Sequence, residues 1–293
     1  MKSRSSSQPT TRPGPFFLAA AFAVLGVIGT YLYFVHTTTG QYIDESALVE
    51  AAVPREKIGL QVSYFLDLLP IISVVIGLVV ILFVTIFRKR WLASGIAILA
   101  MAGANLSTQL FKSALPVRPD QGIATLNFNS LPSGHSTLAA SAAAAVFLVV
   151  SPRWRPFAAF IGGSFAILSG SSTLINQWHR PADVLAAYLV VAAWTCIAGW
   201  LILRSGRSWN VWQGYSAHWA SSRLWPLLSA LLGVAAAVLA TIVLGRLATP
   251  GTQSSTDYFF SGVAMIVIAG YLLTVAGILL FSFAARRPRL SSG

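Results

Sequence analysis

The feature that most constrains this chain is a series of long apolar runs separated by short polar loops. A helix needs about 20 residues to cross the hydrocarbon core of a bilayer, and most of these runs reach that length. Of the 293 residues, 56% are hydrophobic and only 10% are charged, whereas a soluble domain carries about a quarter charged residues. Because an open strand would leave its backbone groups unpaired in hydrocarbon, we expect an all-α, polytopic membrane helical bundle.

The apolar runs divide the chain into eight predicted spans. They cover residues 16–35, 66–87, 91–112, 132–150, 156–175, 183–203, 224–247 and 258–283. The fourth is short and rich in alanine, so we expect it to pack within the bundle. The last two contain few ionisable groups and look like an appendage to a six-helix core. The predicted organisation is a disordered cytoplasmic tail at 1–15, a six-span core at 16–203, a basic loop at 204–223, two additional spans at 224–283 and a basic tail at 284–293.

The distribution of charge predicts the topology. The formal net charge is +12, and the basic residues lie mainly in short loops. Lys and Arg accumulate in cytoplasmic loops of membrane proteins. The basic clusters at 88–90, 153–155 and 204–223 fall on the same side as both termini, whereas the first outer loop, at 36–65, is acidic overall. We therefore predict a multi-pass protein of the cell membrane with cytoplasmic N- and C-termini. No basic stripe accompanies the charge, so nucleic acid is not an expected partner.

A Pro-Ser-Gly-His sequence at 132–135 begins the fourth span on the outer side. Pro132 suits the first turn of a helix, where its missing N–H costs nothing. Ser133 and Gly134 would then present free backbone N–H groups at a helix N-terminus, which favours anion binding. His135 is placed beside them to donate a proton. The alternative interpretation is an ordinary helix cap with an incidental histidine.

A second constellation, His179 and Asp183, precedes the sixth span on the same side. If Pro181 starts a helix, both side chains can lie on one side of its first turn. A carboxylate bound to one imidazole nitrogen fixes the tautomer and leaves the other nitrogen basic and nucleophilic. The alternative is a polar helix start, in which Asp183 only interacts with the helix dipole.

Two cations, Lys112 at the end of the third span and Arg118 just after it, precede these histidines in the chain. Cations in this position can neutralise phosphate oxygens. The alternative for Lys112 is a side chain that snorkels to the membrane interface. Polar residues on one face of the third span and one face of the fifth favour a functional site, because polar faces in a membrane point into the bundle or a wet cavity.

Taken in order, these segments resemble the type 2 phosphatidic acid phosphatase family, which shares a helical core with soluble acid phosphatases and vanadium haloperoxidases. The family pattern is Lys-x6-Arg-Pro, Pro-Ser-Gly-His and Ser-Arg-x5-His-x3-Asp. The second element matches fully, as does His179-x3-Asp183. Two departures exist. Lys112 and Arg118 are separated by five residues, and Thr173 stands where the family has a phosphate-binding Arg. Arg180 is the preferred substitute, with Gln177 and Asn176 as alternatives.

The resemblance implies a metal-independent lipid phosphatase without a cofactor. In the implied mechanism His179 is the nucleophile that forms a phosphohistidine, and Asp183 orients His179. His135 is the general acid and then the general base. Lys112, Arg118, Arg180 and the amides of Ser133 and Gly134 would hold the phosphate oxygens. The expected substrate is a lipid phosphate or a polyprenyl pyrophosphate at the outer membrane face, and vanadate should inhibit. Membrane lipids are the other expected partners, and the oligomeric state stays open.

Two other functions remain open at this stage. A phosphotransferase would pass the phosphoryl group from the phosphohistidine to a sugar or lipid hydroxyl. A catalytically degenerate protein on the same fold would bind or transport a lipid phosphate, and Thr173 is the main support for that alternative.

Overall fold

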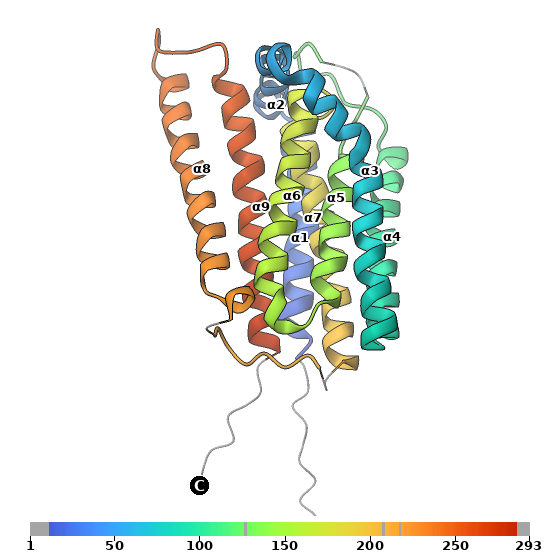
Figure 1. The fold of residues 1–293 in the computed structure, drawn as a ribbon. Helices are drawn as coiled ribbons and strands as arrows, with labels where there is room; N and C mark the ends of the chain where they lie inside the picture. The colour runs from blue at the N-terminus through green and yellow to red at the C-terminus, as the bar shows by residue number, and fades with distance from the viewer. Residues whose placement is uncertain (1–11, 126–127, 207–208, 217, 286–293) are drawn as a thin grey trace, which may run out of the picture.

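The computed structural model describes residues 12–125, 128–206, 209–216 and 218–285. Within these residues the chain forms a bundle of helices (Figure 1). The α-helices are α1 (Gly14–His36), α2 (Thr38–Glu50), α3 (Ala52–Arg88), α4 (Trp91–Ala114), α5 (Gly134–Val149), α6 (Arg155–Ile175), α7 (Pro181–Ser205), α8 (Leu224–Ala248) and α9 (Asp257–Ala284). Two short 3₁₀ helices, η1 (Pro152–Trp154) and η2 (Trp219–Ser221), lie in connections. Most of the predicted tails at 1–15 and 284–293 lies outside the described residues.

Seven of these helices are long and apolar enough to cross a membrane: α1, α3, α4, α6, α7, α8 and α9. The chain is therefore a multi-pass membrane protein, and the predicted all-α polytopic bundle is confirmed. The remaining predicted span corresponds to α5, which has only 16 residues. It packs against α3, α4, α6 and α7. Its small residues Ala139, Ala142 and Ala145 are buried, so neighbouring backbones approach it closely.

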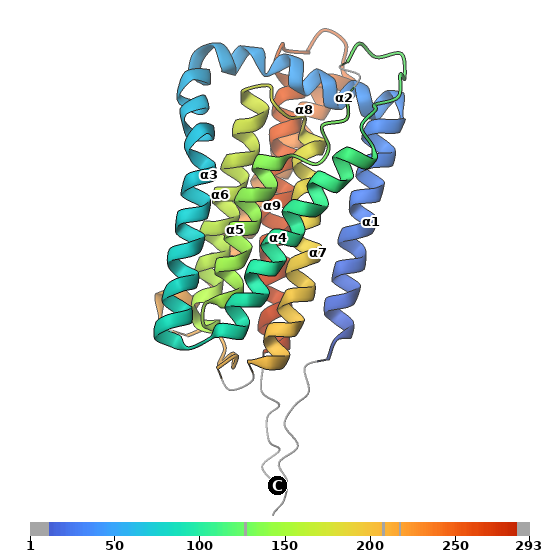
Figure 2. The same cartoon turned by 90° about the vertical axis from the view of Figure 1, so that its right-hand side faces the viewer.

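The stretch at 36–65, predicted as an acidic outer loop, is almost entirely helical. Helix α2 follows α1 directly, and the hydroxyl of Thr37 caps it by accepting a hydrogen bond from the Gly40 amide at 3.0 Å. Figures 1 and 2 show α2 lying across one end of the bundle rather than along it. Helix α3 then begins at Ala52, fourteen residues before the predicted span, and its first turns continue across the same end (Figure 2).

The two ends of the bundle differ in chemistry. At one end lie the α3–α4 turn, η1 and the C-terminus of α7, together with the first turn of α1 and the last turn of α9 (Figure 2). Arg90 and Arg155 belong to this basic end, where they donate hydrogen bonds to the carbonyls of Val149 and Leu148 at 2.9 and 3.4 Å. The opposite end carries α2 and the loops that contain the predicted site.

Aromatic residues hold the helices together near the basic end. The ring of Phe281 on α9 lies 5.4 Å from that of Phe16 on α1 and 4.8 Å from that of Phe147 on α5, measured between centroids. Both pairs have edge-to-face geometry, which aromatic rings prefer. Helix α8, in contrast, packs almost wholly on α9 and lies at the edge of the bundle (Figure 1).

Candidate active site

The three predicted motifs meet at the end of the bundle that α2 covers. His179 lies in the short connection between α6 and α7, His135 lies in the first turn of α5, and Lys112 lies in the last turn of α4. Arg118 follows α4 in the loop that leads to α5. Residues from four separate stretches of the chain are thus brought to one place.

His179 and Asp183 form the pair that the sequence predicted. The Nδ1 atom of His179 lies 3.2 Å from Oδ2 of Asp183, a distance within reach of a hydrogen bond. The side chain of Asp183 is fully buried, and that of His179 keeps 12% exposure. A carboxylate that accepts the Nδ1 proton leaves Nε2 with its lone pair on the exposed side. The geometry is that of an imidazole prepared for nucleophilic attack or for base catalysis.

Asp183 is itself held in place by several donors. The hydroxyl of Ser130 donates to its Oδ2 at 2.6 Å, and the backbone N–H of Arg180 donates to the same atom at 3.1 Å. The backbone amide of Ser133 donates to the Asp183 carbonyl at 2.9 Å, which joins the start of α5 to the start of α7. Sequence reasoning missed Ser130, although it lies only two residues before Pro132.

The start of α5 differs in detail from the expectation. Helix α5 begins at Gly134 with Ser133 as its N-cap, so Pro132 precedes the helix instead of occupying its first turn. The Ser133 hydroxyl accepts from the Ser136 amide at 3.3 Å, and its own amide is bound to Asp183. Ser133 therefore does not offer a free N–H. The amides of Gly134 and His135 have no acceptor among the described residues, and these two open the helix N-terminus toward an anion.

His135 lies near the other chemical groups of the site. Its ring centroid is 5.3 Å from the ring of Trp178, the residue before His179. The positive charge of Lys112 acts on it. His135 is partly buried. It is thus placed at the open N-terminus of α5 and faces the connection that carries His179.

The polar face predicted on the third span packs against α5. Asn105, which belongs to the predicted face with Gln109 and Lys112, donates to the Ser141 hydroxyl at 3.0 Å. Thr108, which was not assigned to that face, shares a hydrogen bond with Thr137 at 2.9 Å. Lys112 lies one turn further toward the site, and no hydrogen-bond partner of its amine is found in the described residues. This face therefore joins α4 to α5 along its length and places the Lys112 amine at the end nearest the site.

Arg118 is a buried cation beside α2. Its Nη2 atom donates to the Phe34 carbonyl at 2.9 Å and lies 3.6 Å from Oδ2 of Asp44. Both side chains are fully buried. The Nε and Nη1 atoms of Arg118 have no partner among the described residues. Buried donors without an acceptor are costly, so these two nitrogens would gain from an additional acceptor.

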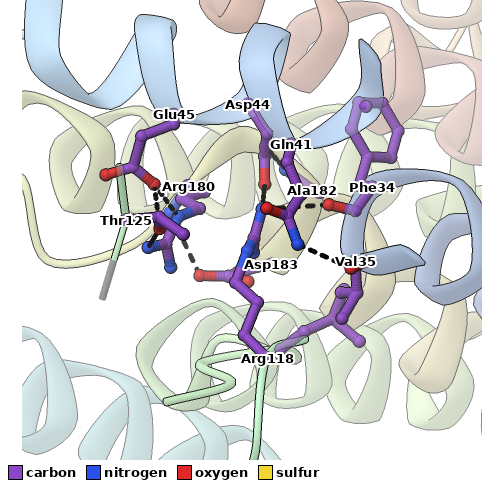
Figure 3. A network of polar contacts seen from close by, with 12 residues as sticks. Phe34, Val35, Gln41, Asp44, Glu45, Arg118, Thr125, Arg180, Ala182 and Asp183 are labelled. Carbon is purple, nitrogen blue, oxygen red and sulfur yellow. Dashed lines mark hydrogen bonds and ion pairs between the residues drawn. The ribbon is translucent and has the colours of Figure 1, made fainter. Parts of the chain in front are cut away.

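Arg180, the preferred substitute for the missing Arg, is already engaged (Figure 3). Its Nε donates to Glu45 at 2.6 Å, its Nη1 to the Ser130 hydroxyl at 3.0 Å and its Nη2 to the Thr125 hydroxyl at 2.7 Å. Only 2% of the residue is exposed. Arg180 thus joins α2 to Ser130, and through Ser130 to Asp183. This arrangement favours a positioning role over direct phosphate binding.

The two alternative substitutes are also bound to the helices at this end. Gln177 donates to the Leu48 carbonyl of α2 at 2.9 Å and accepts from Arg55 of α3 at 3.0 Å. The side-chain amide of Asn176 lies 2.9 Å from the Ser63 hydroxyl of α3. Thr173 itself is fully buried in α6. None of the candidates therefore reaches freely into the site in place of the missing Arg.

Helix α2 contributes two carboxylates that sequence reasoning assigned to a loop. Glu45 binds Arg180, and Asp44 accepts a hydrogen bond from the Ala182 amide at 2.9 Å (Figure 3). Burial, together with repulsion from Asp183, raises the pKa of Asp44 from 3.8 to about 7, although its attraction to Arg118 acts in the opposite direction. Helix α2 is thus docked on the site by two acidic residues in different electrostatic environments.

The raised pKa of Asp44 predicts a pH-dependent stability. A folded-state pKa above the unfolded value favours the folded protein at low pH, and that contribution is lost as pH rises toward the folded pKa. This stabilisation is lost over the pH range from about 3.8, the ordinary pKa, to about 7, the pKa in the folded protein. We expect wild type to lose stability relative to Asp44→Asn across this window, by at most about 1.4 kcal/mol per pH unit. Thermal melting of both proteins in detergent at several pH values measures this. Parallel pH profiles would contradict the assignment.

Comparison with known proteins agrees with the motifs. A sequence model described as the PAP2 superfamily matches residues 91–209. The match runs from the start of α4 to just beyond α7, so it includes all three motifs, while α1 to α3 and α8 to α9 lie outside it. For residues 91–209, it confirms the family predicted from these motifs. No curated protein and no solved structure matches the chain.

Proposed function

We propose that this chain, whose residues 91–209 match the PAP2 superfamily, is an integral membrane lipid phosphatase that works through a phosphohistidine. The observation that carries the proposal is the pairing of His179 with the buried Asp183, at 3.2 Å, beside the open N-terminus of α5. The superfamily consists mainly of phosphatases. The membrane-spanning bundle around the site favours an amphiphilic substrate, because a lipid can place its phosphate at the end of the helices.

The proposed first step is an attack of His179 Nε2 on phosphorus. The N–P bond forms while the bond from phosphorus to the leaving oxygen breaks. Asp183 stabilises the imidazolium through Nδ1–H. His135 donates a proton to the leaving alkoxide, or to the leaving phosphate when the substrate is a pyrophosphate.

In the second step water attacks the phosphohistidine. His135, now neutral, takes a proton from the water, the N–P bond breaks, and inorganic phosphate leaves. The equatorial oxygens gain charge in both steps. The amides of Gly134 and His135, with Lys112 and the unpartnered nitrogens of Arg118, supply positive charge there.

The proposed location is the extracytoplasmic side of the cell membrane. The basic residues at 88–90 and 153–155 lie at the end of the bundle opposite to the site, and the positive-inside rule assigns that end to the cytoplasm. The first turn of α1 and the last turn of α9 lie on that basic side. A lipid phosphate or a polyprenyl pyrophosphate in the outer leaflet is therefore the proposed substrate class.

One observation favours a second candidate, a protein that binds a lipid phosphate without hydrolysing it. Thr173 occupies the position of the family's Arg and is fully buried, and Arg180 is held by Glu45. The site then has one phosphate-binding cation fewer than the family pattern.

Phosphate release distinguishes the candidates. Purified protein in lipid nanodiscs is given phosphatidic acid, phosphatidylglycerol phosphate and a polyprenyl pyrophosphate, and free phosphate is measured with and without vanadate. A phosphatase is expected to release phosphate from at least one of them and to be inhibited by vanadate, which mimics the trigonal-bipyramidal state. Release that falls when an acceptor alcohol is added, with a phosphorylated alcohol as product, would indicate a phosphotransferase. Binding of a lipid phosphate without release would overturn the proposal in favour of a binding protein.

A further inference from the structure

A cavity of about 480 Å³ lies inside the bundle between α1, α5, α6, α7 and α9. It is lined largely by small residues, such as Ala143 on α5, Gly162 on α6, Ala192 on α7 and Gly277 on α9. A Cβ atom added at Gly277 would have no neighbour within 4 Å. The absence of large side chains from these helix faces is thus what keeps the space open.

Apart from the thiol of Cys196, which is a weak donor, the lining offers no free side-chain donor to a polar ligand. Its hydroxyls all donate to backbone carbonyls of the bundle: Tyr188 to Ala166 at 2.6 Å, Thr195 to Val191 at 2.7 Å and Thr274 to Gly270 at 2.8 Å. The other lining atoms are almost all apolar. An apolar cavity of this kind does not hold water, because water needs two or more polar partners.

The cavity is separate from the candidate active site. Its lining residue on α7 nearest to the site is Tyr188, five residues beyond Asp183 and therefore about 7.5 Å further along the helix axis. The lining continues toward the basic end as far as Phe281. A buried layer that includes Leu174, Val184 and Ile266 packs between α6, α7 and α9 on the site side. The cavity therefore belongs to the membrane leaflet opposite to the site.

The cavity reaches the lipid-facing surface of the protein. Two of its lining residues, Phe22 on α1 and Leu272 on α9, are each 65% exposed. Both are in helices that cross the membrane, so hydrocarbon is the medium outside. An empty space of this size would forfeit the dispersion contacts of the atoms around it, and inside a membrane such packing is a main force between helices.

We propose that this cavity binds a hydrocarbon chain of a membrane lipid from the leaflet at the basic end. The chain enters between the exposed faces of α1 and α9 and fills the space left by the small residues Ala192 and Gly277. Because α9 lies outside the segment that matches the PAP2 superfamily, the bound chain joins an added helix to the catalytic core. The site is independent of the proposed reaction, whose phosphate lies at the other end of the bundle.

Photo-crosslinking tests the proposal. The full chain is reconstituted with phosphatidylglycerol that carries a diazirine in the middle of its acyl chain, irradiated, and mapped by mass spectrometry. Peptides of α7 and α9 that line the cavity, including the one with Cys196, are expected to be labelled. In Gly277→Leu the new side chain fills the cavity, and labelling of these peptides should fall several-fold.

The matched control is Gly29→Leu on α1, where an added Cβ also meets nothing within 4 Å and which does not line the cavity. Its labelling should equal that of wild type. Equal labelling in Gly277→Leu and wild type, or no labelled peptide along the cavity in wild type, would overturn the proposal. If Gly277→Leu fails to fold, the proposal is tested on the wild-type protein alone. Removal of bound lipid should lower its melting temperature, and addition of the same phosphatidylglycerol should restore it. Neither the labelling nor the melting temperature depends on phosphate release, so both experiments test lipid binding even if the proposed function is wrong.

Discussion

His179→Ala is expected to reduce phosphate release from a lipid phosphate by at least about 10³-fold, because the variant lacks the atom that attacks phosphorus. The position of His179 supports this role: Nδ1 is 3.2 Å from Asp183, and the side chain keeps 12% exposure. Single-turnover assays in nanodiscs should show no phosphohistidine in the variant. Substrate binding should change much less than the rate, because the cations of the site remain.

The control for this experiment is His218→Ala. His218 lies in the loop at the basic end, far from the site, with its ring 5.9 Å from that of Trp219. Its replacement should leave phosphate release unchanged. If His179→Ala and His218→Ala release phosphate equally fast, His179 is not the nucleophile.

Arg180→Ala is expected to destabilise the folded protein by about 3 kcal/mol, near the lower limit for breaking a buried ion pair. The guanidinium donates to Glu45, Ser130 and Thr125, and its removal leaves the Glu45 carboxylate, which is 12% exposed, without its cation. Reversible unfolding in mixed micelles measures the loss. Since Arg180 also holds Ser130 against Asp183, the rate of phosphate release should fall as well, with a smaller effect on substrate binding.

A partly exposed ion pair provides the comparison. The Arg246 side chain lies 3.4 Å from the buried Asp257 but is itself 45% exposed. Solvent screens this cation, and Asp257 keeps the Ser254 amide as a donor at 2.7 Å. Arg246→Ala should therefore cost much less than Arg180→Ala. The double variant Glu45→Gln, Arg180→Ala should be less destabilised than the sum of its single variants, because the two residues form one pair. A selective loss of substrate affinity in Arg180→Ala, at unchanged stability, would instead identify Arg180 as a phosphate ligand.

The sequence was most informative where a pattern is local. Apolar runs predicted the helical bundle, because hydrocarbon leaves few alternatives for a polypeptide backbone. The spacing of His179 and Asp183 predicted their pairing, since residues four apart lie on one face of a helical turn. The prediction that Pro132 lies in the first turn of a helix was less accurate. Helix α5 starts two residues later, and the Ser133 amide donates to the Asp183 carbonyl.

Helix α2 shows what the sequence did not reveal. Its residues are polar and the helix is short, and short helices are marginal in water without tertiary contacts. Here Gln41 donates to the carbonyls of Val35 and Pro119, at 2.8 and 2.7 Å, while Asp44 and Glu45 bind the start of α7 and Arg180. Except for Val35, these partners are distant in the chain, so no local pattern in 36–65 indicates them.

From the sequence alone follow the membrane-spanning all-α class, the family motifs and the pairing of His179 with Asp183, because each depends on residues close together in the chain or on the solvent around it. Tertiary structure decided which polar side chains of the site have hydrogen-bond partners and which lack them. Arg180 is engaged by Glu45, whereas two nitrogens of the buried Arg118 are left without partners among the described residues. Tertiary structure also decided the cavity beside Gly277, which arises only where small residues of five helices face one another. Hydrogen bonds and packing between distant segments depend on how the helices are arranged, and periodicity along one helix does not specify that arrangement.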